Sequence, residues 1–167
     1  YLNTEPSNEE AEEMNTLFKE VYGEVYCAEL TTEQDPFVYI ARVMNWLDYA
    51  DISWYNNSDV EFTLDTAEEL AGLAKLVNDG TDNFTGKTIT LGTNIDLLNK
   101  EWVPIGTNSN RFQGTFDGNQ KTISNLEGEN GLIAYGGKGD WPVTIKGVTI
   151  ENANINSDGS CVAAIIG

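Results

Sequence analysis

From Phe84 onward, apolar residues recur at two-residue spacing in short runs that Gly, Asn, Asp and Pro separate. Such alternation is typical of β-strands that bury one face. The runs are KTITL (87–91), NIDL (94–97), RFQGTF (111–116), KTISNL (121–126), GLIAY (131–135), VTIKGVTIENANI (143–155) and CVAAIIG (161–167). No helical periodicity interrupts them, so the sequence predicts a mostly β body.

A strand and a helix are predicted just before this β-rich half. The run VEFTL (60–64) alternates, and Thr66 and Glu69 have the spacing of a helix-starting capping box. The helix that follows has a single apolar side, which consists of Leu70, Leu73, Ala74 and Val77. Asn78-Asp79-Gly80 is expected to end it. Because an apolar face requires a packing partner, the helix is expected to lie on the β body.

Residues 1–58 are predicted to form an acidic helical segment of about two helices. The first helix is expected within residues 7–23, and the second within residues 35–50, where a proline is tolerated in the first turn. The segment SWYNNSD (53–59) is rich in turn-forming residues and is the predicted junction. Residues 59–167 then form the second domain, which contains the capping helix and the β body.

A repeat within the β body favours stacked coils over hairpins. The stretches TISNL (122–126) and TIKGV (144–148) share one form and lie 22 residues apart. A fixed spacing of about 20 residues is typical of stacked-coil architectures such as parallel β-helices. On this interpretation FDGNQ (116–120) turns the chain at a corner, and Ile123 stacks near Ile145. A hairpin would instead make the runs on either side of FDGNQ antiparallel neighbours.

Several motifs occur in a fixed order between residues 62 and 167. They are TAEELAGLAKLVNDG, FTGKTITLGTNIDL, EWVPIG and FQGTFDGNQKTISNL, followed by GLIAY and VTIKGVTIENANINSDGSCVAAIIG. With these motifs the stretch resembles bacterial β-helix proteins with GLUG repeats, which include adhesin-like surface proteins and non-catalytic regions of immunoglobulin A peptidases. Two features depart from that family. Its GLVG-like end is replaced by AAIIG (163–167), and residues 1–58 match none of its motifs.

The resemblance implies a short right-handed parallel β-helix whose first coil is covered by the helix at about 66–78. It also implies an extracellular or cell-surface location, with any signal peptide removed or outside this sequence. The sequence stops in an apolar strand where another coil is expected. Three alternatives follow: a longer parent protein, a last coil covered by the N-terminal helices, or edge or end-to-end association at the C-terminal coil.

Charge distinguishes the N-terminal segment from the β body. The chain has a net charge of −18, and residues 1–70 hold 17 Asp and Glu against 2 Lys and Arg, a net −15. A solvated acidic helix face is the simplest interpretation. Direct nucleic-acid binding is not expected, because it depends on clustered Lys and Arg. No run of about 18 apolar residues is present, so no membrane span is expected.

Composition limits the catalytic chemistry. The chain has no His, so it cannot by itself build a Ser-His-Asp, Cys-His or HExxH site. Cys27 and Cys161 are too few for a disulfide framework and match no zinc spacing. Both are expected to be buried small hydrophobic residues, and whether they pair stays open. The sequence therefore predicts no metal site and no cofactor.

One enzyme class remains an alternative, because polysaccharide lyases also use parallel β-helices, with acidic residues that bind Ca²⁺ and an Arg or Lys base. Residues of those types are Asp96, Glu101, Asp117, Arg111 and Lys121. Asp117, however, is predicted to be a turn former within FDGN. The run DGTDN (79–83) lacks the alternating pattern and terminal Glu of a calcium loop, and is predicted to be a helix stop and loop.

Three aromatic residues in polar or glycine-rich loops are the candidate ligand contacts: Trp54, Tyr55 and Trp141. Trp102 in EWVPIG is instead expected to pack beside the first coil. The sequence thus predicts a non-enzymatic, adhesin-like binding module for an unidentified host protein or glycan. The alternatives are a carbohydrate-active β-helix enzyme and an acidic inhibitor that imitates nucleic acid toward a basic partner protein.

Overall fold

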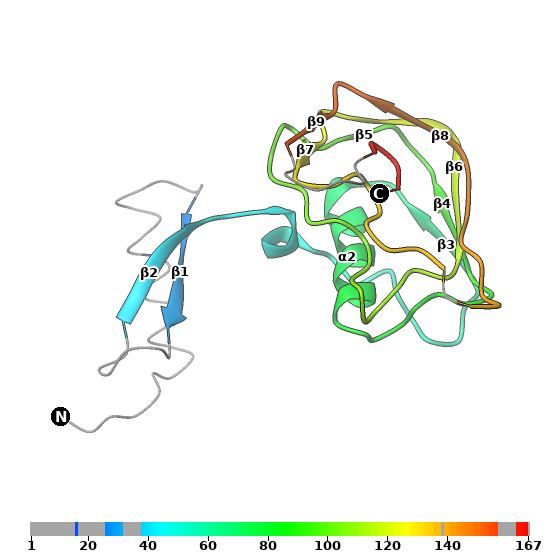
Figure 1. Cartoon of the computed structure of the whole chain (residues 1–167), viewed down its shortest axis with the longest axis horizontal. Coiled ribbons are helices and arrows are strands. Elements are labelled where there is room, and N and C mark those ends of the chain that lie inside the picture. Colours follow the sequence, from blue (N-terminus) through cyan, green and yellow to red (C-terminus); the bar gives the residue numbers. More distant parts are fainter. Residues whose placement is uncertain (1–15, 17–25, 32–37, 138, 157–162, 167) are drawn as a thin grey trace. The chain divides into compact units, whose positions relative to one another are not determined.

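The structure is a computed structural model, and it describes residues 16, 26–31, 38–137, 139–156 and 163–166 of the chain (Figure 1). The chain divides into two compact units, residues 1–44 and residues 45–167. The division lies before the predicted junction at 53–59. Residues 45–58 therefore belong to the same unit as the β body.

The described part of the first unit contains a two-stranded antiparallel sheet. Strand β1 (Tyr26–Thr31) pairs with β2 (Val38–Val43), with Tyr26 opposite Val43. The helix predicted over residues 35–50 is therefore wrong over residues 38–43, whereas residues 46–49 form a short 3-10 helix. The run VYIARV is apolar at nearly every position, so it satisfies a helical and a strand periodicity equally. Its β-branched and aromatic residues favour the strand.

The other predictions for the N-terminal segment are tested less fully. Thr16, which is helical, is the one described residue within the first predicted helix. The side chain of Cys27 and all of Cys161 lie outside the described residues.

In the second unit the described residues form a mixed fold, with one α-helix and several parallel strands. A short 3-10 helix, η1 (Trp46–Tyr49), precedes strand β3 (Glu61–Leu64) and helix α2 (Ala67–Asn78). The remaining strands are β4 (Thr88–Leu91), β5 (Ile95–Asp96), β6 (Thr115–Ser124), β7 (Glu127–Gly128), β8 (Thr144–Glu151) and β9 (Asn154–Ile155). GLIAY and the described part of CVAAIIG form only isolated bridges, such as Ile133 with Ile105 and Ile166.

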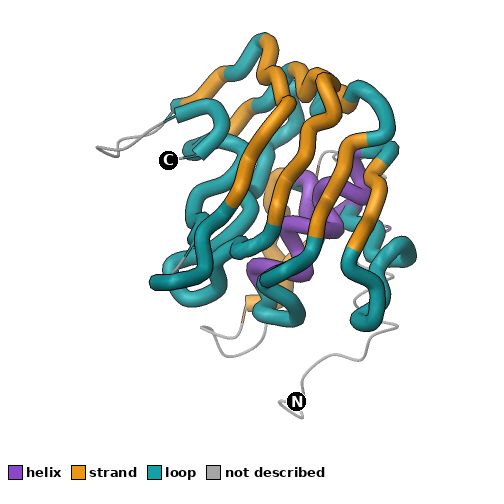
Figure 2. The backbone as a smooth tube through the Cα atoms, turned by 90° about the vertical axis from the view of Figure 1, so that its right-hand side faces the viewer, coloured by secondary structure: helices purple, strands orange, loops and turns teal. Residues whose placement is uncertain are grey.

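Strands β3, β4, β6 and β8 lie side by side in that order, and every pair is parallel (Figure 2). Strand β5 also pairs in parallel with β6, farther along it. Because β6 is parallel to its neighbours on both sides of FDGNQ, this stretch is a corner and no hairpin forms there. Asn119 and Gln120 make the corner with φ values of 48° and 59°.

The register of these strands corrects the predicted repeat. Thr88 lies midway in sequence between its two partners, Glu61 and Thr115, whereas the step from Thr115 to its partner Thr144 is slightly longer. Both steps exceed the predicted spacing, so the alignment of TISNL with TIKGV is wrong. Ile123 pairs with Ile150, and Ile145 pairs with Phe116 instead. The longer step from Thr115 to Thr144 arises at the corner. Three residues, 118–120, separate the paired parts of β6, whereas Gly147 alone separates those of β8.

The buried faces of the strands form columns of apolar side chains. Phe62, Ile89 and Phe116 occupy paired positions in β3, β4 and β6 and are at most 7% exposed. A second column contains Ile95 and Ile123, which occupy paired positions in β5 and β6. Alternation predicted these buried positions, and the parallel register stacks like residues on one another. Trp102 is also buried, as predicted, and its indole N–H donates to the Leu132 carbonyl (3.1 Å).

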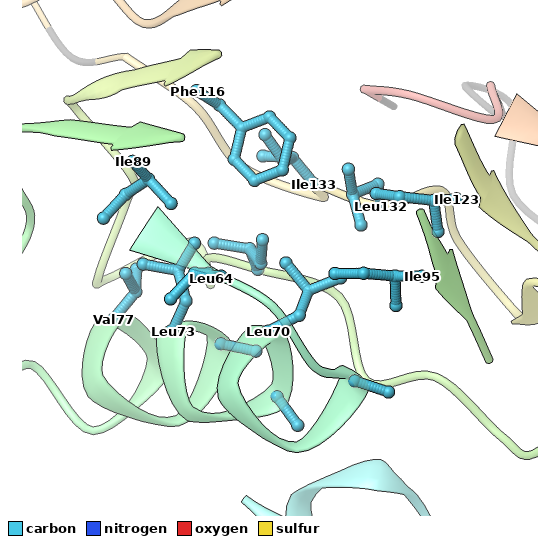
Figure 3. Close-up of a cluster of buried hydrophobic side chains, with 14 of the residues drawn as sticks. Leu64, Leu70, Leu73, Val77, Ile89, Ile95, Phe116, Ile123, Leu132 and Ile133 are labelled. Atoms are coloured by element: carbon cyan, nitrogen blue, oxygen red, sulfur yellow. The ribbon is translucent and has the colours of Figure 1, made fainter. Parts of the chain in front are cut away.

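Helix α2 packs against these columns. Its Leu70, Leu73 and Val77 lie close to Leu64 and Ile89 of the neighbouring strands (Figure 3). The capping box is confirmed, because the Thr66 hydroxyl accepts from the Glu69 amide (3.2 Å) and the Glu69 carboxylate accepts from the Thr66 amide. The predicted stop is confirmed as well: the helix ends at Asn78, and Gly80 has a φ of 73°.

A strap formed by residues 45–55 covers the opposite side of α2. The Asp51 amide donates to the Glu68 carbonyl (2.9 Å), and the Trp54 indole donates to the Asp51 carbonyl (2.9 Å). Gly72 lies beneath this strap. A Cβ atom at Gly72 would come within 1.9 Å of the Asp51 carbonyl oxygen. Helix α2 is thus enclosed between the strap and the strands.

This close contact predicts that Gly72→Ala destabilises the second unit. Alanine favours a helix interior over glycine by about 1 kcal/mol, but the contact is with backbone and cannot be relieved by a rotamer change. Overpacking of this kind costs about 1–3 kcal/mol or more. Chemical denaturation should therefore show a net loss of stability. Lys75→Ala, on the exposed side of the same helix, should change it by less than about 0.5 kcal/mol; a stabilising Gly72→Ala would contradict the contact.

A ladder of polar side chains marks the corner after β5, β6 and β8. Asn125 Nδ2 donates to Asp96 Oδ1 (2.8 Å), and Asn152 Nδ2 donates to Asn125 Oδ1 (3.4 Å). Asn125 and Asn152 both have positive φ, which Asn tolerates better than most residues. The bond from Asn125 is the main cause that lowers the pKa of Asp96.

We expect Asn125→Ala to cost about 1–2 kcal/mol, because it loses the ladder bonds and places a β-carbon at positive φ without compensation. Asn125→Gly loses the same bonds but relieves the backbone, so it should cost about 1 kcal/mol less. Denaturant titrations compare the two variants. In both, NMR titration should find the pKa of Asp96 closer to its ordinary value; an unchanged pKa would contradict the ladder.

Candidate ligand-binding edge

The loops before β3, β4, β6 and β8 meet along one edge of the parallel sheet, which we call the N-terminal edge. They comprise residues 54–60, 79–87, 107–114 and 136–143, with Lys138 outside the described residues. Backbone bonds connect successive loops: the Thr88 amide donates to Val60 (2.8 Å), and the Gln113 amide donates to Asn83 (2.8 Å). In a parallel sheet, loops with the same position along the strand are brought together.

An aromatic and ionic cluster anchors the first two loops. Lys87 Nζ donates to Asp82 Oδ2 at 2.6 Å, and each side chain is only 12% exposed. The Tyr55 hydroxyl donates to the same Asp82 oxygen (2.9 Å). Lys87 Nζ also lies 5.4–5.8 Å from the ring centres of Tyr55, Phe62 and Phe84. The cluster therefore satisfies a partly buried cation with one carboxylate, the Asn57 carbonyl (3.2 Å) and three aromatic rings.

This environment changes the acidity of both partners of the cluster. Burial alone would raise the pKa of Asp82, but hydrogen bonds from Lys87, the Phe84 amide and Tyr55 outweigh burial, and the pKa is lowered. For Tyr55, burial and then the bond to the Asp82 carboxylate raise the pKa to about 12. At neutral pH, Asp82 is thus ionised and Tyr55 is protonated.

The raised pKa of Tyr55 predicts a loss of stability in alkali. An acid whose pKa is higher in the folded state contributes stability below its unfolded pKa of 10.0 and loses it as pH rises toward about 12. Denaturant titrations across this range should show stability falling in the wild type. Tyr55→Phe lacks the ionisable phenol, so the part of the fall due to Tyr55 should disappear. Equal alkaline slopes in the two proteins would contradict this assignment.

A groove of about 390 Å³, the polar groove, lies between the second and third loops. Its polar lining includes the side chains of Asp82, Asn83, Ser109, Asn110, Arg111 and Gln113. Arg111 stacks over the Tyr135 ring at 5.4 Å and donates to Asn108 Oδ1 (3.2 Å). Its Nε is buried and lacks a hydrogen-bond partner among the described residues. Polar groups thus form most of the groove surface, with Val77 as an apolar part of the lining.

A second groove of about 410 Å³, the tryptophan groove, extends to the loop before β8. Its lining includes the side chains of Thr85, Lys87, Gln113, Asp140, Trp141 and Pro142. Trp141 is 58% exposed, which is unusual for so large an apolar side chain. Gln113 lines both grooves, so they are adjacent. Both volumes are in the range of small-ligand sites.

The three aromatic candidates predicted from the sequence all lie at this edge, but only Trp141 presents a largely exposed ring. Trp54 and Tyr55 are partly buried, and each packs against Phe62 and Phe84 with ring centres 5.3–6.3 Å apart. They support the floor of the edge. Of the three, Trp141 lines the tryptophan groove.

The five residues considered for a lyase site are dispersed over the second unit. Asp96 belongs to the Asn125 ladder, Asp117 pairs with Lys146 (2.9 Å), and Glu101 bridges to Glu127. Arg111 lies in the polar groove, and Lys121 follows the corner of β6. Within the described ranges, no hydrogen bond or ion pair joins any two of the five. Asp117 is a turn former, as predicted, since its Oδ1 accepts from the Asn119 amide (2.9 Å).

The sequence did not identify Asp82, Lys87, Asn83 or Gln113 as site residues. Asp82 was assigned to a loop, which is correct, because its Oδ1 accepts from the Phe84 amide (2.7 Å). Its pairing with Lys87 depends on the fold of the loop, and Gln113 reaches the edge only through the parallel register. One signal for these residues was available in the sequence. The strands that follow the first three loops begin near Glu61, Thr88 and Thr115, at equal spacing.

Searches for metal sites and for relatives add little to this picture. In the part of the chain that the structure describes, no group of three or more His, Cys, Asp or Glu residues could hold a metal ion, and no helix is long and apolar enough to cross a membrane. Comparisons with protein-family models, curated proteins and solved structures each found no match.

Proposed function

We propose that residues 59–167, with residues 45–58 packed on them, form the first turns of a right-handed parallel β-helix of the GLUG-repeat type. Parallel pairing at a nearly constant step along the chain, from Glu61 to Thr88, Thr115 and Thr144, supports this architecture. The preference of parallel crossovers for the right hand, about 98%, supports the handedness. Helix α2, apolar on most of its surface, then serves as the cover of the first turn.

The function we propose is that of a non-enzymatic binding module in an extracellular or cell-surface, adhesin-like protein. The observation that supports it best is the pair of adjacent grooves at the N-terminal edge, beside the exposed ring of Trp141. Loops presented by a rigid stack of strands are a common place for binding residues. An exposed aromatic residue at a groove is a typical contact for a partner.

Binding of extracellular ligands to the immobilised whole chain tests this function. We would use neutral and acidic glycans, mucin-type glycoproteins and the same glycoproteins after deglycosylation. At least one ligand should be retained by the wild type and lost by Trp141→Ala. Leu98→Ala is the matched control, because Leu98 is 64% exposed and lines neither groove; it should retain the ligand.

Three outcomes would contradict the proposal. Retention that is indifferent to Trp141→Ala, or no retention at all, would remove the N-terminal edge as a binding surface. Release of cleaved products during incubation with a polysaccharide panel would replace the binding module by a carbohydrate-active enzyme, and Arg111→Ala and Lys121→Ala would then locate the catalytic base.

A further inference from the structure

We propose that the ligand of the N-terminal edge is an uncharged oligosaccharide that occupies the polar groove and the tryptophan groove together. This inference rests on the proposed binding function and specifies its ligand class. Because Gln113 lines both grooves, one extended ligand can follow them without leaving the surface. Two adjacent grooves of about 390 and 410 Å³ suit an extended ligand of several sugar units.

The hydrogen-bonding groups along the grooves suit hydroxyl-rich ligands. Gln113 Oε1 accepts from Thr85 (2.9 Å), and Asn83 Oδ1 accepts from the Thr85 amide (2.9 Å). The side-chain amide nitrogens, Gln113 Nε2 and Asn83 Nδ2, have no partner within the described residues and can donate to a ligand. Asn110 donates to the Asn78 carbonyl (2.8 Å), which leaves its Oδ1 as an acceptor. Sugar hydroxyls both donate and accept, so they match this mixed set.

These polar side chains are held in place by the fold. Asn110 donates a hydrogen bond to the last residue of α2, and Gln113 accepts one from Thr85 in the preceding loop. The ion pair of Asp82 and Lys87 fixes the boundary between the two grooves. A site whose polar groups are already positioned loses less conformational entropy on binding.

The tryptophan groove adds an apolar surface to the polar one. Trp141 exposes 58% of its surface, and Pro142 beside it is also exposed. A pyranose ring has one face composed largely of C–H groups, and such a face packs well against a flat aromatic ring. A sugar has hydroxyls at its rim and an apolar face. The polar groove can bond the hydroxyls, and the exposed ring of Trp141 can pack against the apolar face.

Charge favours a neutral sugar over an acidic one. The charged residues that line the grooves are Asp82 and Asp140 with Lys87 and Arg111, so their charges cancel. Asp82 and Lys87 also neutralise each other directly at 2.6 Å. The whole chain has a net charge of −18, which repels anionic polymers at low ionic strength. An acidic ligand would find no excess positive charge in the grooves and would be repelled by the chain. An uncharged ligand needs no such charge and is not repelled.

Titration calorimetry with the whole chain tests the inference. The probes are neutral gluco-, manno- and N-acetylglucosamine oligosaccharides, from disaccharides to hexasaccharides, and oligogalacturonates of the same lengths. We expect a neutral series to bind, with Kd falling as the ligand grows long enough to fill both grooves. Trp141→Ala should raise Kd about tenfold, and Gln113→Ala should weaken long oligosaccharides more than disaccharides. Leu98→Ala should leave Kd unchanged, and thermal unfolding confirms that each variant is folded.

The possible failures are distinguishable. If a deglycosylated protein, or an oligogalacturonate in preference to every neutral sugar, is retained in a manner that depends on Trp141, the binding function stands and the neutral-glycan inference is overturned. If a neutral sugar binds equally to wild type and Trp141→Ala, the inference also fails, because the sugar binds elsewhere. If no probe in either experiment depends on Trp141, the binding function and the inference fail together.

Discussion

Replacing Phe84 by alanine is expected to lower the free energy of unfolding of the second unit by about 3–5 kcal/mol. Phe84 is fully buried, and its ring centre lies 5.8–6.3 Å from those of Trp54, Tyr55, Phe62 and Phe112. Neighbours anchored in strands and in the strap cannot all move to fill the space. Removal of the ring therefore leaves a cavity where four aromatic contacts were made.

Leu98→Ala is the matched control for this prediction. Phe84 and Leu98 have φ values of 61° and 56°, so both substitutions place alanine in the same left-handed region. Leu98 is 64% exposed, and its truncation should change stability by less than about 0.5 kcal/mol. Denaturant titrations of the two variants thus separate burial from backbone strain. A loss below about 1 kcal/mol for Phe84→Ala would mean that the aromatic cluster repacks.

Asp82→Ala is expected to cost about 3–5 kcal/mol, because it leaves the Lys87 ammonium partly buried without its carboxylate. It also removes the acceptor of the Phe84 amide and of the Tyr55 hydroxyl. In the double variant Asp82→Ala/Lys87→Met the uncompensated charge is absent, so stability should recover by about 1–4 kcal/mol. A double-mutant cycle measures this coupling. If the double variant were less stable than Asp82→Ala, Lys87 would stabilise the edge through the aromatic rings and its bond to the Asn57 carbonyl.

The same carboxylate predicts a dependence on acid. Its pKa is lowered in the folded state, so its contribution is complete above the unfolded value of about 3.9 and is lost as pH falls through the lower folded value. Asp82→Asn is the appropriate comparison, because it keeps the shape and removes the titration. The wild type should lose more stability than this variant between about pH 5 and pH 2; parallel curves would show that Asp82 is not stabilised as an anion.

Local signals in the sequence were sufficient for the elements of the second unit. The capping box at Thr66 and Glu69, the end of α2 and the alternation of buried residues in β3 and β4 were all predicted correctly. Each depends on residues within a few positions of one another. That FDGNQ is a corner was also predicted correctly, but from the repeat alignment that the register corrects, since its Gly, Asn and Asp would suit a hairpin turn as well.

The register could not be obtained in that way, because β8 contains the Thr-Ile pair twice. Thr144-Ile145 and Thr149-Ile150 both present an inward isoleucine, so either could be aligned with Thr122-Ile123 without breaking alternation. The structure pairs the second of them, which places Thr144-Ile145 against Thr115-Phe116. Only the fit of whole strands on both sides of the corner decides between the two alignments.

The candidate site depended on the register and was therefore predicted only in part. Trp141 was identified because its neighbours are glycine and charged residues. Trp54 and Tyr55 have a similarly polar sequence context, yet they pack against Phe62 and Phe84 and are partly buried. These contacts depend on the fold and cannot be seen in the sequence. Gln113 had no local signature, since its importance comes from lying between loops that are adjacent only in space.

The corner of β6 has a consequence for how such a chain diverges. It accommodates a longer segment than the matching corner of β8, and the pairs on both sides remain in step. Because the difference is an even number of residues, it preserves which side chains point inward. Insertions and deletions can thus accumulate at corners while the stacked columns stay intact.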